Sequence, residues 1–398
     1  MEVRPIRPIE KIQVSKIQNI AFSSSRDFSQ AQENMEEFQR GFETGRAAFD
    51  DQGKMCSCLE LIPYKVRFDG HIVSMGGIGG VASLPEERKK RYIRHIFKYC
   101  MEEMYEKGYV FSYLYPFSHP YYRKFGYELN MVGIECSIPF SSLGHFEQGG
   151  DVRMYTAGMD TTGIITVYNQ FIQDKNLSVV REEKQWESFF EKDPYKDNVF
   201  LYTWYDEEGS AKGYIQYSVK RAEDDEHEHD IKVLEFIWLN TVAFQGILAF
   251  LKNFSSHFNK IVWKSPHFVD ILSFFPEPYQ IEQQLQASGM NRVVNAQKAL
   301  ELMQVPCGNG NITIEIKDEF FTRNSAKYKV IWENGRLEVI SGRDESDIIC
   351  NINEFTQLVT GFSSVSQLNA AKKIELSGNP TMLNHLFAKK DLFLNDYF

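Results

Sequence analysis

Residues 79–127 read GGVASLPEERKKRYIRHIFKYCMEEMYEKGYVFSYLYPFSHPYYRKFGY, and their order decides the fold of this region. A glycine-rich strand leads into a basic loop, an amphipathic helix, a second strand and an aromatic turn. Apolar side chains recur at i, i+3, i+4 and i+7 from Ile93 to Tyr105, which predicts a helix with one buried face. Gly108 is a good stop for this helix.

The basic loop before the helix is expected to meet an anion. Ser83 and Glu86 have the spacing of a capping box, so free backbone N–H groups are expected at a helix start near residues 85–88. The cations beside them are Arg88, Lys89, Lys90 and Arg91. This pattern predicts a pyrophosphate site, although a solvated basic first turn on an ordinary helix would look the same.

Composition bounds the class of protein. The chain has 398 residues, so two or three domains are expected, and 43% hydrophobic residues are enough for globular cores. A net charge of −10 argues against nucleic acid as a partner, whereas an anionic cofactor at a local basic loop and a cationic substrate fit it. The six cysteines lack a metal-like spacing and are read as free thiols. Without an apolar signal core or a membrane-length run, a cytoplasmic protein with no membrane partner is expected.

The chain divides into three expected domains: residues 1–148, 149–288 and 289–398. The second repeats the first in its order of helices, strand meander, helix and strand. Its equivalent loop, residues 239–243, has no basic residue, so this copy is interpreted as structural and without a cofactor. The third is richer in strands, and Asn334–Gly335 predicts a tight hairpin.

Two other patterns are not interpreted as ligand sites. His227, Glu228 and His229 lie in an acidic loop, and their alternation without a further anchor is more typical of a solvated hairpin than of a metal site. Gly76, Gly77, Gly79 and Gly80 precede or lie within a strand instead of opening a helix, so they predict a β-bulge or a close backbone approach, not a dinucleotide-binding loop.

The strand, PExRxx loop, helix, strand and YxxFGY motif together resemble the acetyl-CoA-binding half of a GNAT acetyltransferase, and in particular the Eis family. The resemblance covers the whole chain. It implies a mixed α/β (α+β) protein with tandem GNAT folds, whose sheets are mixed and splayed, and a C-terminal sterol-carrier-protein-like α+β domain. The local signals are YRKFGY at residues 122–127 and the terminal DYF at residues 396–398.

The resemblance also implies the catalytic groups. Tyr122, which opens YxxFGY, corresponds to the general acid, and the terminal carboxylate of Phe398 corresponds to the base. Spacing alone does not settle which tyrosine of this turn acts. An ammonium with a pKa near ~10 must lose a proton before it attacks a thioester, and a tyrosine can return a proton to the departing thiolate.

The family's cofactor contacts fall on a run of backbone and side-chain positions: Val81, Ser83, Arg88, Lys89, Phe117 and Ser118. Arg91 and Ile93 stand where the family has glycines that let phosphate approach the backbone. Arg91 either binds phosphate directly or obstructs it. Phe22 and Asp27 fall in the segment that lines the family's substrate cavity, although a helix N-cap is the stronger interpretation of Asp27.

The implied function is acetyl-CoA-dependent N-acetyl transfer to an amine of a polycationic, aminoglycoside-like small molecule. The family also implies a homo-oligomer, with a hexamer as one candidate. The alternative is a catalytically impaired GNAT-fold protein that binds a hydrophobic ligand or a protein partner, and the replacements at Arg91 and Ile93 favour it.

Overall fold

A computed structural model describes residues 1–25, 28, 39–221 and 229–397. Within these residues the chain forms two compact units. Unit 1 contains residues 1–130, 288–390 and 396–397, and unit 2 contains residues 131–287 and 391–395. Unit 1 therefore combines the first and last parts of the chain, with the middle part in unit 2.

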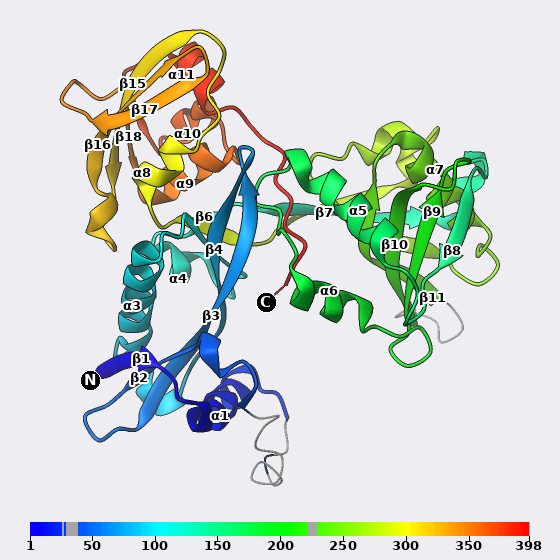
Figure 1. Cartoon of the computed structure of the whole chain (residues 1–398), viewed down its shortest axis with the longest axis horizontal. Helices are drawn as coiled ribbons and strands as arrows, with labels where there is room; N and C mark the ends of the chain where they lie inside the picture. Colours follow the sequence, from blue (N-terminus) through cyan, green and yellow to red (C-terminus); the bar gives the residue numbers. More distant parts are fainter. Residues whose placement is uncertain (26–27, 29–38, 222–228, 398) are drawn as a thin grey trace. The chain divides into compact units, whose positions relative to one another are not determined.

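The first sheet of unit 1 has seven strands in the order β1-β2-β3-β4-β5-β14-β6 (Figure 1). They are β1 Glu2–Pro5, β2 Gly45–Phe49, β3 Met55–Phe68, β4 His71–Ser83, β5 Phe111–Leu114, β6 Glu128–Leu129 and β14 Met290–Val293. Strand β4 runs parallel to β5, and the other neighbours are antiparallel. Strand β14 comes from far along the sequence and lies between β5 and β6, so the last part of the chain completes this sheet.

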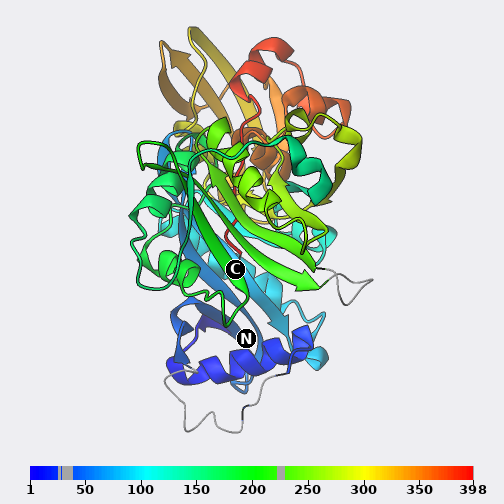
Figure 2. The same ribbon diagram turned by 90° about the vertical axis from the view of Figure 1, so that its right-hand side faces the viewer.

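Two helices cover opposite faces of this sheet: α1 Lys11–Phe22 and α3 Tyr92–Glu106. Figure 2 shows α1, in dark blue, against one end of the sheet. Cys58 packs with Val14 of α1, whereas its neighbour Leu59 packs with Phe97 of α3. Because successive side chains of a strand point to opposite faces, the two helices lie on different sides. The predicted apolar stripe of α3 is confirmed as its buried face.

The C-terminal part of unit 1 has a five-stranded sheet in the order β17-β16-β15-β18-β19. Its strands are β15 Asn309–Lys317, β16 Ala326–Glu333, β17 Arg336–Ser341, β18 Ile348–Asn351 and β19 Glu375–Leu376. The helices of this part are α8 Ala296–Glu301, α9 Ile352–Thr360, α10 Val365–Ala370 and α11 Pro380–Leu386. The predicted hairpin joins β16 to β17, with Asn334 and Gly335 at φ +49° and +82°. Helix α9 packs against β14 and β6 as well as β18, and so connects the two sheets of unit 1.

Unit 2 has its own seven-stranded sheet in the order β13-β7-β12-β11-β10-β9-β8. Its strands are β7 Val132–Pro139, β8 Asp151–Met154, β9 Val199–Tyr205, β10 Ala211–Arg221, β11 His229–Trp238, β12 Lys260–Pro266 and β13 Glu282–Ala287. The helices are α5 Thr162–Phe171, α6 Glu183–Phe190 and α7 Thr241–Lys252. Tyr214 packs with α5 and its neighbour Ile215 with α7, so these helices also cover opposite faces.

The mixed α/β architecture with three mixed sheets confirms the expected fold class. The expected domain boundaries do not coincide with the division into sheets. Strand β7, inside the expected first domain of residues 1–148, pairs with β12 and β13 of the second sheet. Strand β14, at the start of the expected third domain, belongs to the first sheet. Sequence periodicity marks where a strand lies along the chain but not which strand it pairs with.

Candidate functional site

Strand β4 extends beyond β5 and leaves part of its backbone without a strand partner on that side. It pairs with β5 from Met75 to Ile78, yet it continues to Ser83. The pairing of β3 with β4 shifts register here, and Gly80 has φ +56°. A Cβ at Gly80 would lie 2.1 Å from Nε2 of Gln18, which donates a hydrogen bond to the Gly80 carbonyl at 3.2 Å. The predicted β-bulge is therefore confirmed, and α1 holds it in place.

The loop after β4 differs from the prediction. Lys89 and Arg91 have φ values of +67° and +66°, in the left-handed region that a right-handed helix cannot pass through. A short 3-10 helix spans Pro85–Glu87, but it does not continue into α3, which begins at Tyr92 with Arg91 as its N-cap. The prediction that the long helix starts near residues 85–88 is therefore wrong. The Ser83 hydroxyl lies 2.7 Å from that of Ser57 and caps no helix. The unpaired N–H groups of the helix start consequently lie at residues 92–94.

A cavity of about 1110 Å³ opens beside the free part of β4. Its walls come from α1, β3, β4, the basic loop, α3 and the aromatic turn. The residues that line it are Ala21, Phe22, Ser57, Val81, Ala82, Ser83, Glu87, Arg88, Lys89, Arg91, Tyr92, Ile93, Arg94, Phe117, Tyr121, Lys124 and Phe125. Of the predicted site residues, this set contains Phe22, Val81, Ser83, Arg88, Lys89, Arg91 and Phe117. Tyr122 and Ser118 are not among them, and Asp27 and Phe398 lie outside the described residues.

The cavity carries an excess of positive charge. Glu87 accepts hydrogen bonds from Lys90 at 2.9 Å and from Lys54 at 3.1 Å, and these contacts lower the pKa of its carboxyl group. Within the described residues no ion pair joins Arg88, Lys89 or Arg91 to a carboxylate. Glu87, the one carboxylate among the lining residues, is thus neutralised by Lys54 and Lys90. Arg88, Lys89 and Arg91 border a space large enough for an anion.

Tyr122 lies behind the aromatic wall of the cavity. It belongs to the short helix α4 His119–Arg123 and has only 3% of its surface exposed. The centroid of its ring lies 5.3 Å from that of Phe117 and 5.2 Å from that of Tyr121. Both of these residues line the cavity. Burial raises the pKa of Tyr122 above its usual value, which is itself well above 7, so the phenol keeps its proton at neutral pH.

The last described residues of the chain dock at the end of β5. The Tyr115 hydroxyl donates a hydrogen bond to the Asp396 carbonyl at 3.1 Å. The rings of Tyr115 and Tyr397 stack with centroids 4.6 Å apart. Tyr115 precedes Phe117, an aromatic residue of the cavity wall, by two residues. The tail is therefore bound to a residue that is close in sequence to this wall.

Comparisons with known protein families cover most of the chain. Residues 2–130 and residues 177–293 each match an acetyltransferase (GNAT) domain, and residues 296–395 match a sterol carrier protein domain. The chain is a GNAT-family acetyltransferase.

Solved structures share the full-length fold of this acetyltransferase. A probable N-acyltransferase from Enterococcus faecalis is 24% identical with a TM-score of 0.86, covering 100% of this chain and 99% of the other. A GCN5-related N-acetyltransferase from Anabaena variabilis is 22% identical with the same TM-score, and both chains are covered completely. Eis1 from Mycobacterium abscessus is 15% identical with a TM-score of 0.83, also over both complete chains. The resemblance to the Eis family is thus confirmed in domain content and fold, while no curated protein matches the sequence.

The acetyltransferase has cavity residues that the sequence did not single out. Arg94, Tyr121, Lys124 and Phe125 line the cavity although none was predicted as a site residue. Lys124 and Phe125 belong to the YRKFGY motif, of which only Tyr122 was interpreted as functional, and Tyr121 directly precedes that motif. Arg94 lies in the first turn of α3, and its side chain lines the same cavity as that of Arg91.

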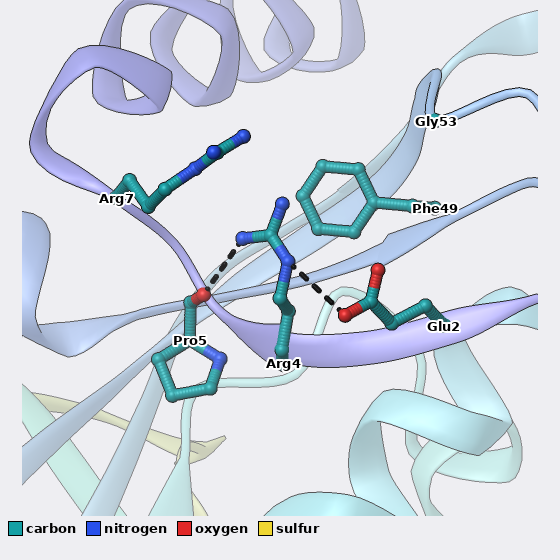
Figure 3. Close-up of a pocket in the computed structure, with 6 residues that line it drawn as sticks. All are labelled: Glu2, Arg4, Pro5, Arg7, Phe49 and Gly53. Atoms are coloured by element: carbon teal, nitrogen blue, oxygen red, sulfur yellow. Dashed lines mark hydrogen bonds and ion pairs between the residues drawn. The ribbon is translucent and has the colours of Figure 1, made fainter.

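A second, smaller cavity of about 430 Å³ lies at β1, between Arg4, Arg7 and Phe49 (Figure 3). Its cations are already satisfied. Arg4 binds both carboxylate oxygens of Glu10 at 2.8 Å and lies 4.0 Å from the Phe49 ring centroid, and Arg7 binds Glu10 at 2.6 Å. This site therefore lacks the unpaired charge of the larger cavity.

In the described ranges, with their gaps at 26–27, 29–38 and 222–228, no cluster of His, Cys, Asp or Glu could hold a metal ion. His227 and Glu228 of the acidic loop lie outside those ranges. The helices within them are all too short or too polar to cross a membrane.

Proposed function

We propose that this acetyltransferase uses acetyl-CoA to acetylate an amine of a polycationic, aminoglycoside-like small molecule. The observation that carries the proposal is the cavity of about 1110 Å³ at the free part of β4, with Arg88, Lys89 and Arg91 on its wall. A pyrophosphate carries the complementary charge, and the part of β4 beyond its pairing with β5 offers N–H and C=O groups to an extended pantetheine chain.

The residues present fit this cofactor. The backbone of Val81 and Ser83 would pair with the amides of the pantetheine chain. The side chains of Arg88, Lys89 and Arg91 and the N–H groups at the start of α3 would hold the phosphates. Acetyl-CoA, when bound, supplies the thioester that an amine attacks. Phe117 and Tyr121 line one side of this space.

We assign two proton-transfer roles to this chain. Tyr122, which like an ordinary phenol is protonated at neutral pH, would donate its proton to the departing thiolate. The carboxylate at Phe398 would accept the proton of the amine, and the docking of Asp396 and Tyr397 on Tyr115 supports this role, because it restrains the residues next to it. Phe22 and Asp27 are the proposed contacts of the amine substrate, and Phe22 borders the same cavity.

We also propose that the second GNAT domain, at residues 149–288, is structural. Its helix α7 is the counterpart of α3. Asn240 caps this helix and its Oδ1 accepts the Ala243 N–H at 2.9 Å. A side chain thus occupies the helix start that a phosphate would need.

Calorimetric titration with acetyl-CoA, followed by an assay of CoA release with a panel of amines, tests the proposal. Heat of binding together with CoA release is the expected result. A second candidate function, a GNAT-fold binding protein without catalysis, is favoured by Arg91 and Ile93 at the family's glycine positions. Absence of both binding and CoA release would support that candidate instead.

A further inference from the structure

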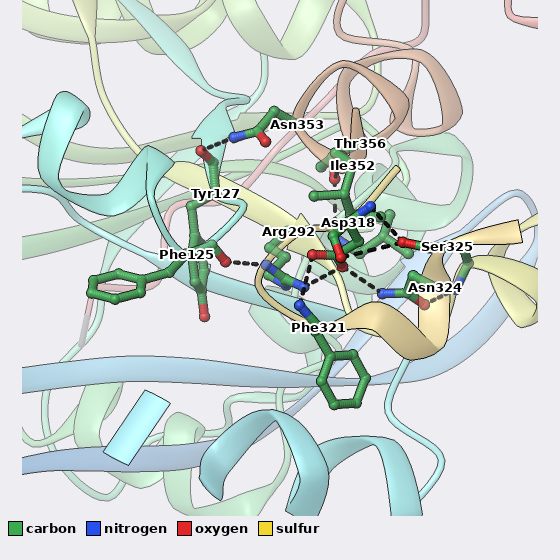
Figure 4. A network of polar contacts seen from close by, with 12 residues as sticks. Phe125, Tyr127, Arg292, Asp318, Phe321, Asn324, Ser325, Ile352, Asn353 and Thr356 are labelled. Atoms are coloured by element: carbon green, nitrogen blue, oxygen red, sulfur yellow. Dashed lines mark hydrogen bonds and ion pairs between the residues drawn. The ribbon is translucent and has the colours of Figure 1, made fainter. Parts of the chain in front are cut away.

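A fully buried ion pair lies between the first sheet of unit 1 and its C-terminal domain (Figure 4). Arg292 of β14 and Asp318 have no exposed side-chain surface, and Nη2 of Arg292 lies 2.5 Å from Oδ2 of Asp318. Asp318 also accepts the N–H of Phe321 at 2.9 Å and the side-chain amide of Asn324 at 3.0 Å. The carboxylate is thus held rigidly by its own domain, and Arg292 is held by the carboxylate.

The other end of the same guanidinium reaches the turn of the YxxFGY motif. Nη1 of Arg292 donates a hydrogen bond to the Phe125 carbonyl (Figure 4). Gly126 follows with φ +83°, and a Cβ there would lie 1.9 Å from Nη1 of Arg292. The glycine of this motif is therefore required by the arginine beneath it as well as by its backbone conformation.

Helix α9 of the C-terminal domain binds the rest of this turn. The Asn353 side chain donates to the Tyr127 carbonyl at 2.9 Å, and the Gln357 side chain donates to the Leu129 carbonyl at 2.7 Å. The carbonyls of residues 125, 127 and 129 are thus all held by side chains from residues 292–357.

The turn at residues 122–127 contains Phe125 of the cavity wall and Tyr122, the proposed acid, so contacts to this turn bear on the reaction. Phe125 lines the cofactor cavity and stacks on Phe97 of α3, with centroids 4.5 Å apart. The N–H groups of Phe125 and Tyr127 both bond to the Tyr122 carbonyl, at 2.9 and 3.4 Å. A shift of the turn would consequently move both the cavity wall and the proposed acid.

We propose that Arg292 is a positioning residue for acetyl transfer, which couples Asp318 of the C-terminal domain to the turn that holds Tyr122. The inference rests on the proposed function of Tyr122. The C-terminal domain thereby contributes to the chemistry through the backbone of the first GNAT domain, in addition to any contribution from the tail.

Arginine is the residue that this role requires. Its planar fork presents separate N–H groups to Asp318 and to the Phe125 carbonyl at the same time, whereas a lysine ammonium is a single point on a flexible stem. Arg292→Lys keeps the positive charge beside Asp318 but cannot hold both partners in the same geometry.

The test compares Arg292→Lys with a matched core variant, Val330→Ala, which removes buried volume from β16 at a residue with no exposed surface. Melting temperature, kcat, and KM for acetyl-CoA are measured well below both melting points. For Arg292→Lys we expect kcat to fall roughly 10- to 100-fold, as misplaced groups do, with KM changed by less than about threefold. Val330→Ala should lower the melting temperature and leave both constants near those of the unmodified protein.

Amide hydrogen exchange of residues 122–127 gives a readout that needs no turnover. Exchange there should become at least tenfold faster in Arg292→Lys and stay unchanged in Val330→Ala. If Arg292→Lys does not fold, the double variant Arg292→Met/Asp318→Asn, which leaves no buried charge, is used for the same measurements.

Normal kcat together with normal exchange in the Arg292 variant would overturn the positioning role. The positioning role would also be overturned if kcat fell in both variants in proportion to the decrease in their melting temperatures. If the unmodified protein acetylates no amine, the proposed function fails, while faster exchange in the variant would still establish the coupling of the C-terminal domain to the turn.

Discussion

Replacing Arg91 with glycine separates the two proposed roles of this side chain, which lines the cavity at β4. Arg91 is the N-cap of α3, has φ +66° and lines the cavity. As a phosphate ligand it strengthens cofactor binding, and as an obstruction it weakens binding. Arg91→Gly removes the side chain and gives the backbone a residue that adopts this conformation without strain.

Two magnitudes set the expected result. A left-handed conformation costs a residue with a side chain about 1–2 kcal/mol, and glycine loses about 0.4–1 kcal/mol more backbone entropy on folding, so the variant should be more stable by up to about 1.6 kcal/mol. A hydrogen bond to a charged group contributes about 1.5–3 kcal/mol. Loss of that bond weakens binding roughly 10- to 150-fold, since 1.4 kcal/mol is tenfold.

The assay is calorimetric titration of acetyl-CoA, paired with urea unfolding. Lys372→Gly is the matched control, because Lys372 is exposed, has φ +56° and lies in the C-terminal domain away from the cavity residues. It should gain stability in the same way and bind the cofactor normally. Arg91→Ala should lose the same affinity as Arg91→Gly without the gain in stability.

The reasoning is refuted if Arg91→Gly binds acetyl-CoA more tightly than the unmodified protein. That result would identify the side chain as an obstruction and favour a protein that has lost the cofactor. A weaker dependence of affinity on salt in both Arg91 variants would agree with a lost charge contact.

Three further perturbations test the site and the fold. Tyr122→Phe should lower kcat about 10²- to 10⁴-fold while titration still detects cofactor binding; unchanged kcat would exclude Tyr122 as the acid. A short Gly-Ser extension after Phe398 should abolish turnover without weakening cofactor binding, and full activity of the extended chain would contradict the base assignment. The Arg46–Glu103 pair joins β2 to α3 at 2.7 Å, and the hydrogen bonds from Arg46 lower the pKa of Glu103 from 4.5 to about 2. The stability from this pair is therefore present above pH 4.5 and lost as pH falls towards 2. Glu103→Gln should lower the free energy of unfolding at pH 7 by about 3 kcal/mol, and urea unfolding should show a smaller loss between pH 4.5 and 2 than in the unmodified protein.

Local patterns in the sequence were sufficient for the order of the elements. The apolar stripe of residues 93–105 predicted α3, and Asn334–Gly335 predicted the hairpin of the C-terminal sheet. Both depend on interactions between residues close in the chain: helical periodicity in one case and turn conformation in the other. The basic loop likewise indicated the positive charge of the cavity, because the cations are consecutive in the sequence.

The helix start shows where such patterns failed. Ser83 and Glu86 have capping spacing, but the left-handed Lys89 and Arg91 move the start of α3 to Tyr92. A positive φ at a residue other than glycine has no reliable sequence signal, because the surrounding structure imposes it.

By itself, the sequence determined the elements, their order, the charge of the loop and the family that these features resemble. Only the tertiary structure decided that β14 completes the first sheet, that β7 leaves it, and that Arg292 lies beneath Gly126. The physical reason is that strand pairing and buried ion pairs join residues far apart in the chain. Tertiary packing determines which strands and side chains pair, and local periodicity of the sequence carries no information about it.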